Sequence, residues 1–410
     1  MHSIYIAFLK RVLILFLGLY VFPFPLTLFN FLTELLKPIE LFYQWLIPWI
    51  GTNILYLEKE IIIFTNGSGD TTYDYLLVAF KFVLSIIMGV FWLLYDLRGN
   101  KKRRQLWRLF KSGITYYLAY TLISYGMYKI VPIQFSPPSF FRLLQAYGDS
   151  SPMGLAWTFF GFSKGYNLFL GLGEFIAGTL LLHRKTRLIG TLIALAILMN
   201  IVAINFFYDI PVKLFSSLLL LMILIVGKKD LTRICALSFS TLLNDNKREK
   251  SPTLLIKNRT LVFGFKWVLV LMIFFEPINS VIESKENNAQ FNRPIFYGLY
   301  KTDLFILNND TLNLEIPNDI KWNYMGIEYA NSIQFFKSNK VRKGYATEID
   351  TTKNRISFTA FSNENKKFNL HYSISMDTLI LKGIIDKDSV HVRAIRKDRS
   401  DFRLTNRGFH

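Results

Sequence analysis

Apolar segments of membrane-spanning length, separated by basic loops, constrain this chain more than any other feature of its sequence. Such segments occur at 12–32, 75–94, 113–131, 166–182, 188–207, 214–226 and 260–278, and most of them can cross the hydrocarbon core of a bilayer. Lysine and arginine concentrate after the second, fourth and sixth segments, as they do in cytoplasmic loops. The pattern predicts a multi-pass protein of the bacterial cell (inner) membrane. About seven transmembrane helices would place the amino terminus in the cytoplasm and the carboxyl-terminal domain outside it.

The net charge of +19 has the same explanation. Many of the cations lie in loops beside membrane segments, which favours membrane lipid as a contact and argues against nucleic acid. Cys235 is the only cysteine, so one chain can form neither a disulfide nor a cysteine-based metal cluster. No histidine-rich metal spacing, catalytic triad or phosphate-binding loop occurs, and we expect no metal site.

Residues 1–112 are expected to hold two transmembrane helices. The first starts near Val12 and continues past Pro23 and Pro25, because membrane helices tolerate prolines as kinks. An interfacial helix over 39–50, with Trp45 and Trp49 at headgroup level, and a basic cytoplasmic loop complete this part.

Residues 113–230 are expected to form a four-helix membrane domain. Its external segment holds two capped helices, one from Ser139 to Gly148 and one after Ser151 that ends before Gly161. A basic cytoplasmic linker over 231–259 and a seventh transmembrane helix over 260–280 follow.

Beyond residue 286 the sequence period changes from helical to alternating. Segments rich in Phe, Tyr, Ile and Val predict strands, and short turns between them favour an antiparallel meander. We expect an extracytoplasmic β-barrel or sandwich over 286–410. The predicted strands are 297–306, 326–336, 355–361, 367–374, 378–385 and 389–396.

One carboxylate, Glu174, lies within the fourth apolar segment, and a carboxylate in a bilayer suggests a functional site. Gly171 and Gly178 share its helix face, so a neighbouring helix can approach closely and Glu174 should point into the bundle. A desolvated carboxylate needs a partner. Lys129 is the first choice and Lys213 the second.

Other polar residues are predicted to line a pocket near Glu174 that opens to the outside. A purely structural role is the alternative for four of them: interhelical hydrogen bonding for Asn200, interfacial snorkelling for Lys213, helix-start stabilisation for Asp209 and turn formation for Asp149. An ion pair that locks the bundle is as good an explanation of Glu174 as a functional site. The remaining candidates are Asn200, Asn205, Asp209 and Lys213 in the helices, and Gln145, Tyr147 and Asp149 in the external segment.

Several of these stretches resemble the DoxX/DoxD family of four-helix membrane proteins. The resemblance is carried by Tyr125–Lys129, Gly171–Glu174, Gly178–Leu182 and Asn205–Lys213, and it covers about 113–226. The external stretch 144–152 resembles a longer branch of the family. The resemblance implies characteristic Lys, Gly and Glu positions at Lys129, Gly171, Glu174 and Gly178. It also implies a link to membrane redox complexes, since the family name comes from a subunit of an archaeal thiosulfate:quinone oxidoreductase.

Three functions are compatible with the sequence. The helices could anchor the β-domain as a binding or assembly component that docks a membrane or extracytoplasmic partner subunit. Alternatively, the chain could be an oxidoreductase subunit acting on a quinone or sulfur compound around Glu174. This chain has no haem or flavin motif, so a partner would supply the redox cofactor. A small-molecule transporter is the third function, although no inverted repeat is visible.

Overall fold

The computed structural model describes residues 2–63, 69–96, 103–238, 259–287, 293–313, 320–329, 331–337, 341–361 and 363–405. The chain divides into two compact units, one formed by 1–131 and 168–281 and the other by 132–167 and 282–410. The external segment, which the sequence analysis placed with the four-helix membrane domain, therefore belongs to the unit that contains the β-domain. Most of the expected basic linker, part of the loop after the second span, and the last five residues lie outside the described residues.

The first unit begins with three helices, in which α1 packs against α3 and α2 also contacts α3. Phe16 of α1 meets Phe82 of α3 edge to face, with ring centroids 5.4 Å apart. The regular helix ends at Val21 and both prolines lie in turns, although the apolar span continues past Pro23 and Pro25, as expected, and ends at Leu28. Proline cannot donate a backbone hydrogen bond and its ring clashes with the preceding turn. The elements are α1 (His2–Val21), η1 (Leu26–Leu28), α2 (Asn30–Asn53) and α3 (Thr72–Asp96).

The second helix is longer than the expected interfacial segment, because it starts at Asn30 and contains both Pro38 and Pro48. Its outward residues include Phe31, Trp45 and Trp49, which are exposed in this structure. The long apolar surface agrees with contact to lipid rather than water.

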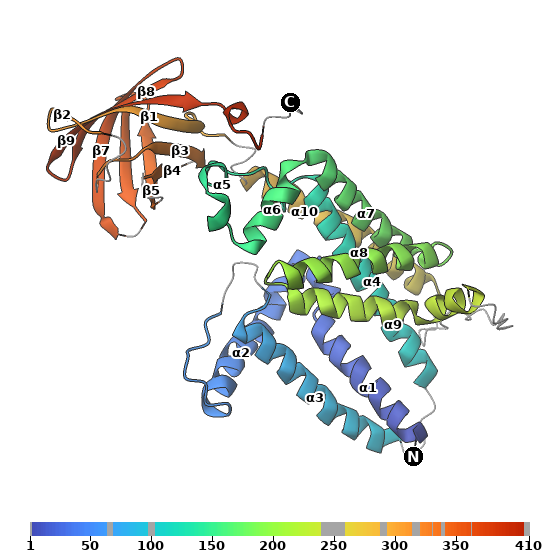
Figure 1. Ribbon diagram of the computed structural model, residues 1–410. Coiled ribbons are helices and arrows are strands. Elements are labelled where there is room, and N and C mark those ends of the chain that lie inside the picture. Colours follow the sequence, from blue (N-terminus) through green and yellow to red (C-terminus); the bar gives the residue numbers. More distant parts are fainter. Residues whose placement is uncertain are drawn as a thin grey trace. The chain divides into compact units, whose positions relative to one another are not determined.

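Five further long helices follow, and Figure 1 shows α8 and α9 running side by side. The helices α7 and α8 match the expected spans closely. The helices α4 and α9 extend beyond them into flanking basic sequence, and α10 continues past residue 280 to Asn287. The helices are α4 (Arg103–Ile130), α7 (Lys164–Leu182), α8 (Arg187–Phe207), α9 (Lys213–Ser238) and α10 (Arg259–Asn287).

Five helical segments among the described residues are long and apolar enough to cross a membrane. They are Ile4–Leu28, Thr72–Tyr95, Lys164–Leu182, Arg187–Phe207 and Thr260–Asn287. The helices α4 and α9, which cover the other two expected spans, are not among these five segments. The second half of α4 is rich in tyrosine, and the apolar run of α9 ends at Val226, just before two lysines.

The second unit starts with the short elements α5 (Phe140–Leu144), η2 (Tyr147–Asp149) and α6 (Pro152–Phe162). Both predicted caps are present: the Ser139 hydroxyl accepts from the Arg142 amide, and the Ser151 hydroxyl accepts from the Gly154 amide. The predicted ends were wrong. The first helix stops at Leu144 rather than Gly148, and the second includes Gly161.

The β-domain is an antiparallel barrel of eight strands, closed by pairing of β1 with β9 (Figure 1). The expected meander is confirmed, and the short β2 extends only the end of β1. The strands are β1 (Gly298–Leu307), β2 (Asp310–Thr311), β3 (Tyr324–Tyr329), β4 (Ser332–Phe336), β5 (Arg342–Asp350), β6 (Arg355–Ala360), β7 (Asn363–Ser375), β8 (Thr378–Ile385) and β9 (Asp388–Lys397).

Two strand predictions needed correction. The expected single strand over 326–336 is a hairpin of β3 and β4, which turns at Asn331 with a backbone φ of 62°. Strand β5 was not predicted, because it starts with Arg342, Lys343 and Gly344 and buries little of its first half. The alternating strands direct large apolar side chains into the barrel. Its fully buried core includes Phe305, Met325, Ile333, Phe358 and Leu379.

Candidate functional site

The predicted ion pair is present within the first unit. The Lys129 Nζ atom lies 2.7 Å from Glu174 Oε2, and the two side chains are only 6% and 3% exposed. Lys129 comes from the last turn of α4, and Glu174 lies in the middle of α7. The Lys129 ammonium also lies 5.4 Å from the centroid of the Tyr125 ring, one helical turn earlier. Each buried charge therefore has a partner.

Glycines bring α4 and α7 close enough for this pair to form. A Cβ atom added at Gly171 would lie 2.6 Å from the Gly126 carbonyl oxygen, and one at Gly178 would lie 2.8 Å from the Ala119 carbonyl oxygen. Such distances leave no room for any side chain. The predicted small-residue face of α7 is therefore a contact face for α4.

Hydrogen bonds also connect α4 with α10. The Tyr120 hydroxyl donates to Glu276 Oε2 at 2.7 Å, and the hydroxyls of Tyr128 and Ser280 are 2.6 Å apart. Glu276 was missed in the sequence analysis. The same argument that selected Glu174, a carboxylate inside an apolar segment, applies to it.

Lys213 does not pair with Glu174. Its Nζ atom lies 2.6 Å from Asp209 Oδ1, four residues earlier, and the Asp209 side chain is 80% exposed. The start of α9 is instead capped by Asp70, whose two carboxylate oxygens accept from the backbone amides of Lys213 and Leu214 at 2.7 and 2.9 Å. Asp209 was expected to stabilise this helix start, but Asp70 does so. The long separation of Asp70 from α9 along the chain gave no sign of this contact.

The two asparagines of α8 differ. Asn205 is buried, and its side-chain amide donates to the Ser216 hydroxyl of α9 at 2.9 Å, so the interhelical hydrogen bond that was weighed for Asn200 is made by Asn205 instead. Asn200 is exposed, and so is Ala196. Asn200 therefore lies off the buried face of α8, which includes Ala194, Leu198 and Asn205.

The external candidates interact locally within the second unit. Gln145 accepts from the Arg142 guanidinium at 2.7 Å and donates to the Asp149 carbonyl oxygen at 2.7 Å, while Tyr147 is 80% exposed. These bonds fit the turn-forming role that was weighed for Asp149. Neither unit alone brings the predicted pocket residues together.

Arg399, which the sequence analysis overlooked, ties the external segment to the barrel within the second unit. Its guanidinium donates to the Pro138 carbonyl oxygen at 2.6 Å and to Glu328 Oε1 at 3.2 Å. The same Glu328 oxygen accepts the Phe140 amide at 2.9 Å. Burial raises the pKa of Glu328 above its usual range, and the hydrogen bond from Phe140 and the charge of Arg399 oppose this shift.

The burial of the Lys129–Glu174 pair limits the chemistry that this site can perform. A desolvated ion pair with both members satisfied can hold two helices together, whereas proton exchange would require the pair to open. No group of three His, Cys, Asp or Glu side chains suited to a metal ion occurs in the described parts of the chain.

Comparison with known proteins places the chain in a family. Over 129 residues it is 36% identical to the uncharacterized protein YwoB of Bacillus subtilis (strain 168). The matched region makes up 32% of this chain and 82% of YwoB. The chain belongs to the YwoB family. The match covers most of YwoB but only about a third of this chain, so the comparison says nothing about the other two thirds. No family profile and no solved structure matches the chain.

Proposed function

We propose that this protein is a non-enzymatic membrane anchor that presents its β-barrel on the extracytoplasmic side, as a binding or assembly component of a membrane complex. In this proposal the chain crosses the membrane seven times, with its amino terminus in the cytoplasm. The helices α4 and α9 add two crossings to the five strongly apolar segments. Their basic ends do not enter the membrane, because the cations there stay on the cytoplasmic side.

The closed Lys129–Glu174 pair carries the proposal. Both side chains are buried and each has its partner at hydrogen-bonding distance. Glycines bring the surrounding backbones into contact. These features favour a lock between α4 and α7 over a site that exchanges protons with a substrate, so the helices act as a scaffold.

The division of the chain supports a scaffold that holds an external domain. Residues 132–167, between α4 and α7, form one compact unit with the barrel. The barrel is therefore connected to the membrane helices both through this segment and through α10. Two connections restrain a domain more than one tether does.

The helices α4, α7, α8 and α9 correspond to the DoxX-type four-helix unit in this proposal. Any redox cofactor or quinone would then be held with a partner subunit, and the role of the Lys129–Glu174 pair would be structural. The oxidoreductase alternative assigns Glu174 a direct role beside the quinone.

Double substitution distinguishes the two roles. Glu174→Gln should lower the apparent melting temperature of the purified chain, since removal of one partner of a buried ion pair costs roughly 3–5 kcal/mol. Lys129→Met in the same molecule should recover part of the loss. Glu283→Gln, at an exposed position of α10, is the matched control.

The opposite result would favour the oxidoreductase alternative. It would consist of a Glu174→Gln protein with wild-type stability that no longer retains a quinone carried by the wild-type protein through purification. Quinone content can be measured by extraction and mass spectrometry of the same samples.

A further inference from the structure

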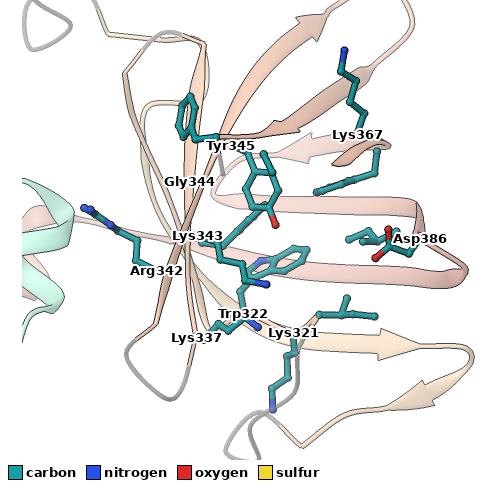
Figure 2. A pocket seen from close by; sticks show the side chains of 15 residues that line it. Lys321, Trp322, Lys337, Arg342, Lys343, Gly344, Tyr345, Lys367 and Asp386 are labelled. Atoms are coloured by element: carbon teal, nitrogen blue, oxygen red, sulfur yellow. The ribbon is translucent and has the colours of Figure 1, made fainter. Parts of the chain in front are cut away.

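A cavity of about 440 Å³ opens at one end of the barrel (Figure 2). This volume lies in the range of small-molecule sites. Its wall comes from the end of β4, the start of β5, the segment before β3, and the ends of β6 and β8. The core of the barrel below it is filled by aromatic and aliphatic side chains. The cavity is therefore a site at the mouth rather than a channel through the barrel.

The cavity is strongly basic. Five cationic side chains and one carboxylate, that of Asp386, belong to its lining. Figure 2 shows Lys337 and Lys343 extending toward the Trp322 side of the opening, whereas Arg342 points away from it. Arg342 lies over the Phe141 ring of α5 at 4.5 Å. Lys321 donates to the Asn313 carbonyl oxygen. Lys367 extends away from Trp322 in Figure 2, so Lys337 and Lys343 are the cations whose side chains face the opening there, and a positive opening attracts anions.

Trp322 supplies an independent sign of a ligand. Its side chain is 3% exposed and lines the cavity. Its Nε1–H group is buried without a hydrogen-bond acceptor among the described residues. Buried indole N–H groups usually have an acceptor, and a buried donor without one costs about 1–3 kcal/mol. A ligand oxygen would satisfy this donor.

The rest of the wall is aromatic. Trp322 stacks on Phe335 with ring centroids 4.2 Å apart, and Tyr345 meets Phe368 edge to face at 5.4 Å. Phe361 lies over Gly344, where an added Cβ would come within 2.8 Å of its ring. These rings offer apolar faces beside the cations. A flat or chain-like apolar body would lie against them while an anionic group meets Lys337 and Lys343.

We propose that the barrel mouth binds an amphiphilic anion, a molecule with a carboxylate or phosphate group attached to an apolar body. The anionic oxygens would accept from Trp322 Nε1–H and pair with Lys337 and Lys343. The apolar body would contact Tyr345 and Phe361. The biological setting of this site, on the outer side of the membrane, rests on the proposed function, but the binding itself does not.

The test uses the full chain in nanodiscs of zwitterionic lipid, with empty nanodiscs to correct for partitioning. Binding of 2-naphthoate is measured by equilibrium dialysis. Its neutral counterpart 2-naphthamide keeps the aromatic body without the charge, and inorganic phosphate keeps a charge without the body. Decanoate, as a competitor, represents an anion with an alkyl chain. Saturable binding of 2-naphthoate should be at least tenfold tighter than that of 2-naphthamide or phosphate, and it should weaken as salt is raised.

Substitutions locate the site. Lys337→Gln with Lys343→Gln, and separately Trp322→Phe, should each weaken 2-naphthoate binding by roughly tenfold or more, because a hydrogen bond to a charged group is lost. Lys382→Gln, at an exposed position of β8 outside the cavity lining, should leave binding unchanged. The lysine double variant keeps the test valid if Trp322→Phe folds poorly, because Lys343 is exposed and Lys337 is half-buried. Competition by decanoate would indicate a lipid-type ligand, and its failure would indicate an aromatic one.

Three results would overturn the site: no saturable binding of either anion, equal binding of 2-naphthamide or phosphate, or wild-type binding in the lysine double variant. The anchor proposal fails on a different observation. It would be contradicted by a barrel located in the cytoplasm, whether or not the barrel binds 2-naphthoate.

Discussion

The Arg399 guanidinium and the Glu328 carboxylate lie 3.2 Å apart and join the external segment 132–167 to the barrel. Arg399 also lies over the Phe140 ring at 4.6 Å, and Phe140 is buried with Leu299 and Phe336. Residues separated by more than 250 positions thus form one small interface in the second unit. An isolated barrel cut at residue 286 would expose the apolar part of this interface.

Arg399→Ala should detach the external segment from the barrel. It would leave the largely buried Glu328 carboxylate with the Phe140 amide as its remaining hydrogen-bond donor among the bonds described above. We expect a loss of roughly 1–3 kcal/mol, below the range for a fully buried pair because Arg399 is partly exposed. Limited proteolysis of the purified chain should then cleave within 132–167 faster than in the wild-type protein.

Arg403→Ala is the control for this prediction, since Arg403 is exposed and lies four residues further along the chain. Equal cleavage rates in the two variants would show that Arg399 does not hold the segment.

Gly171→Ala should separate α4 from α7. The added methyl group would meet the Gly126 carbonyl oxygen and the Ile130 amide, both backbone atoms that cannot rotate away. Overpacking of this kind costs about 1–3 kcal/mol, and it would stretch the Lys129–Glu174 pair. The apparent melting temperature of the purified chain measures the loss.

Gly173→Ala, on the same helix, provides the comparison. Its added methyl would lie 3.4 Å from the Ile197 side chain, a contact that a small shift can relieve. Because alanine favours helices over glycine, this variant should be neutral or slightly stabilised. If Gly171→Ala were as stable as Gly173→Ala, the proposed helix contact would be wrong.

The helices and the ion pair can be predicted from the sequence, because both follow from local sequence patterns and from the free-energy cost of burying an unpaired charge. Apolar runs mark the helices, prolines and capping serines mark several ends, and the expense of an unpaired carboxylate in lipid predicts the partner of Glu174. The spacing of Gly171 and Gly178 identifies the contact face. These features need no knowledge of distant residues.

Other features depend on contacts that sequence spacing does not reveal. Asp70 caps α9 from 143 residues away, and Arg399 reaches Pro138 across 261 positions. The start of strand β5 is too polar to show the alternation of apolar and polar residues that predicts a strand. The sequence of the β3–β4 hairpin resembles that of one continuous apolar strand. Asn200 was expected to line a pocket near Glu174, but it is exposed, because α8 buries its other side.

Acid should weaken the barrel through His391. Burial lowers the pKa of this histidine below its ordinary value, and Lys382 and Arg393 lower it further. Lys382 lies directly opposite on β8, and the opposite residue on β1 is Ile306. Because the folded pKa is lower than the unfolded one, the stabilisation is complete above about pH 6.5 and is lost as pH falls through the folded pKa.

The pH dependence of the melting temperature tests this assignment. His391→Gln should melt with a flatter profile below about pH 6.5 than the wild-type protein. Lys382→Gln should flatten it in part, because one neighbouring positive charge is removed. Superimposable profiles of the wild-type protein and His391→Gln would exclude this histidine as a source of acid sensitivity.

Cysteine labelling of intact cells tests the central claim most directly. Single cysteines are introduced at Arg103, where α4 begins, and at Thr351, in the exposed turn between β5 and β6, in a Cys235→Ala background. An impermeant thiol reagent should label position 351 in intact cells and position 103 only after the membrane is opened. Labelling of position 103 but not position 351 in intact cells would contradict an anchor that presents the barrel outside.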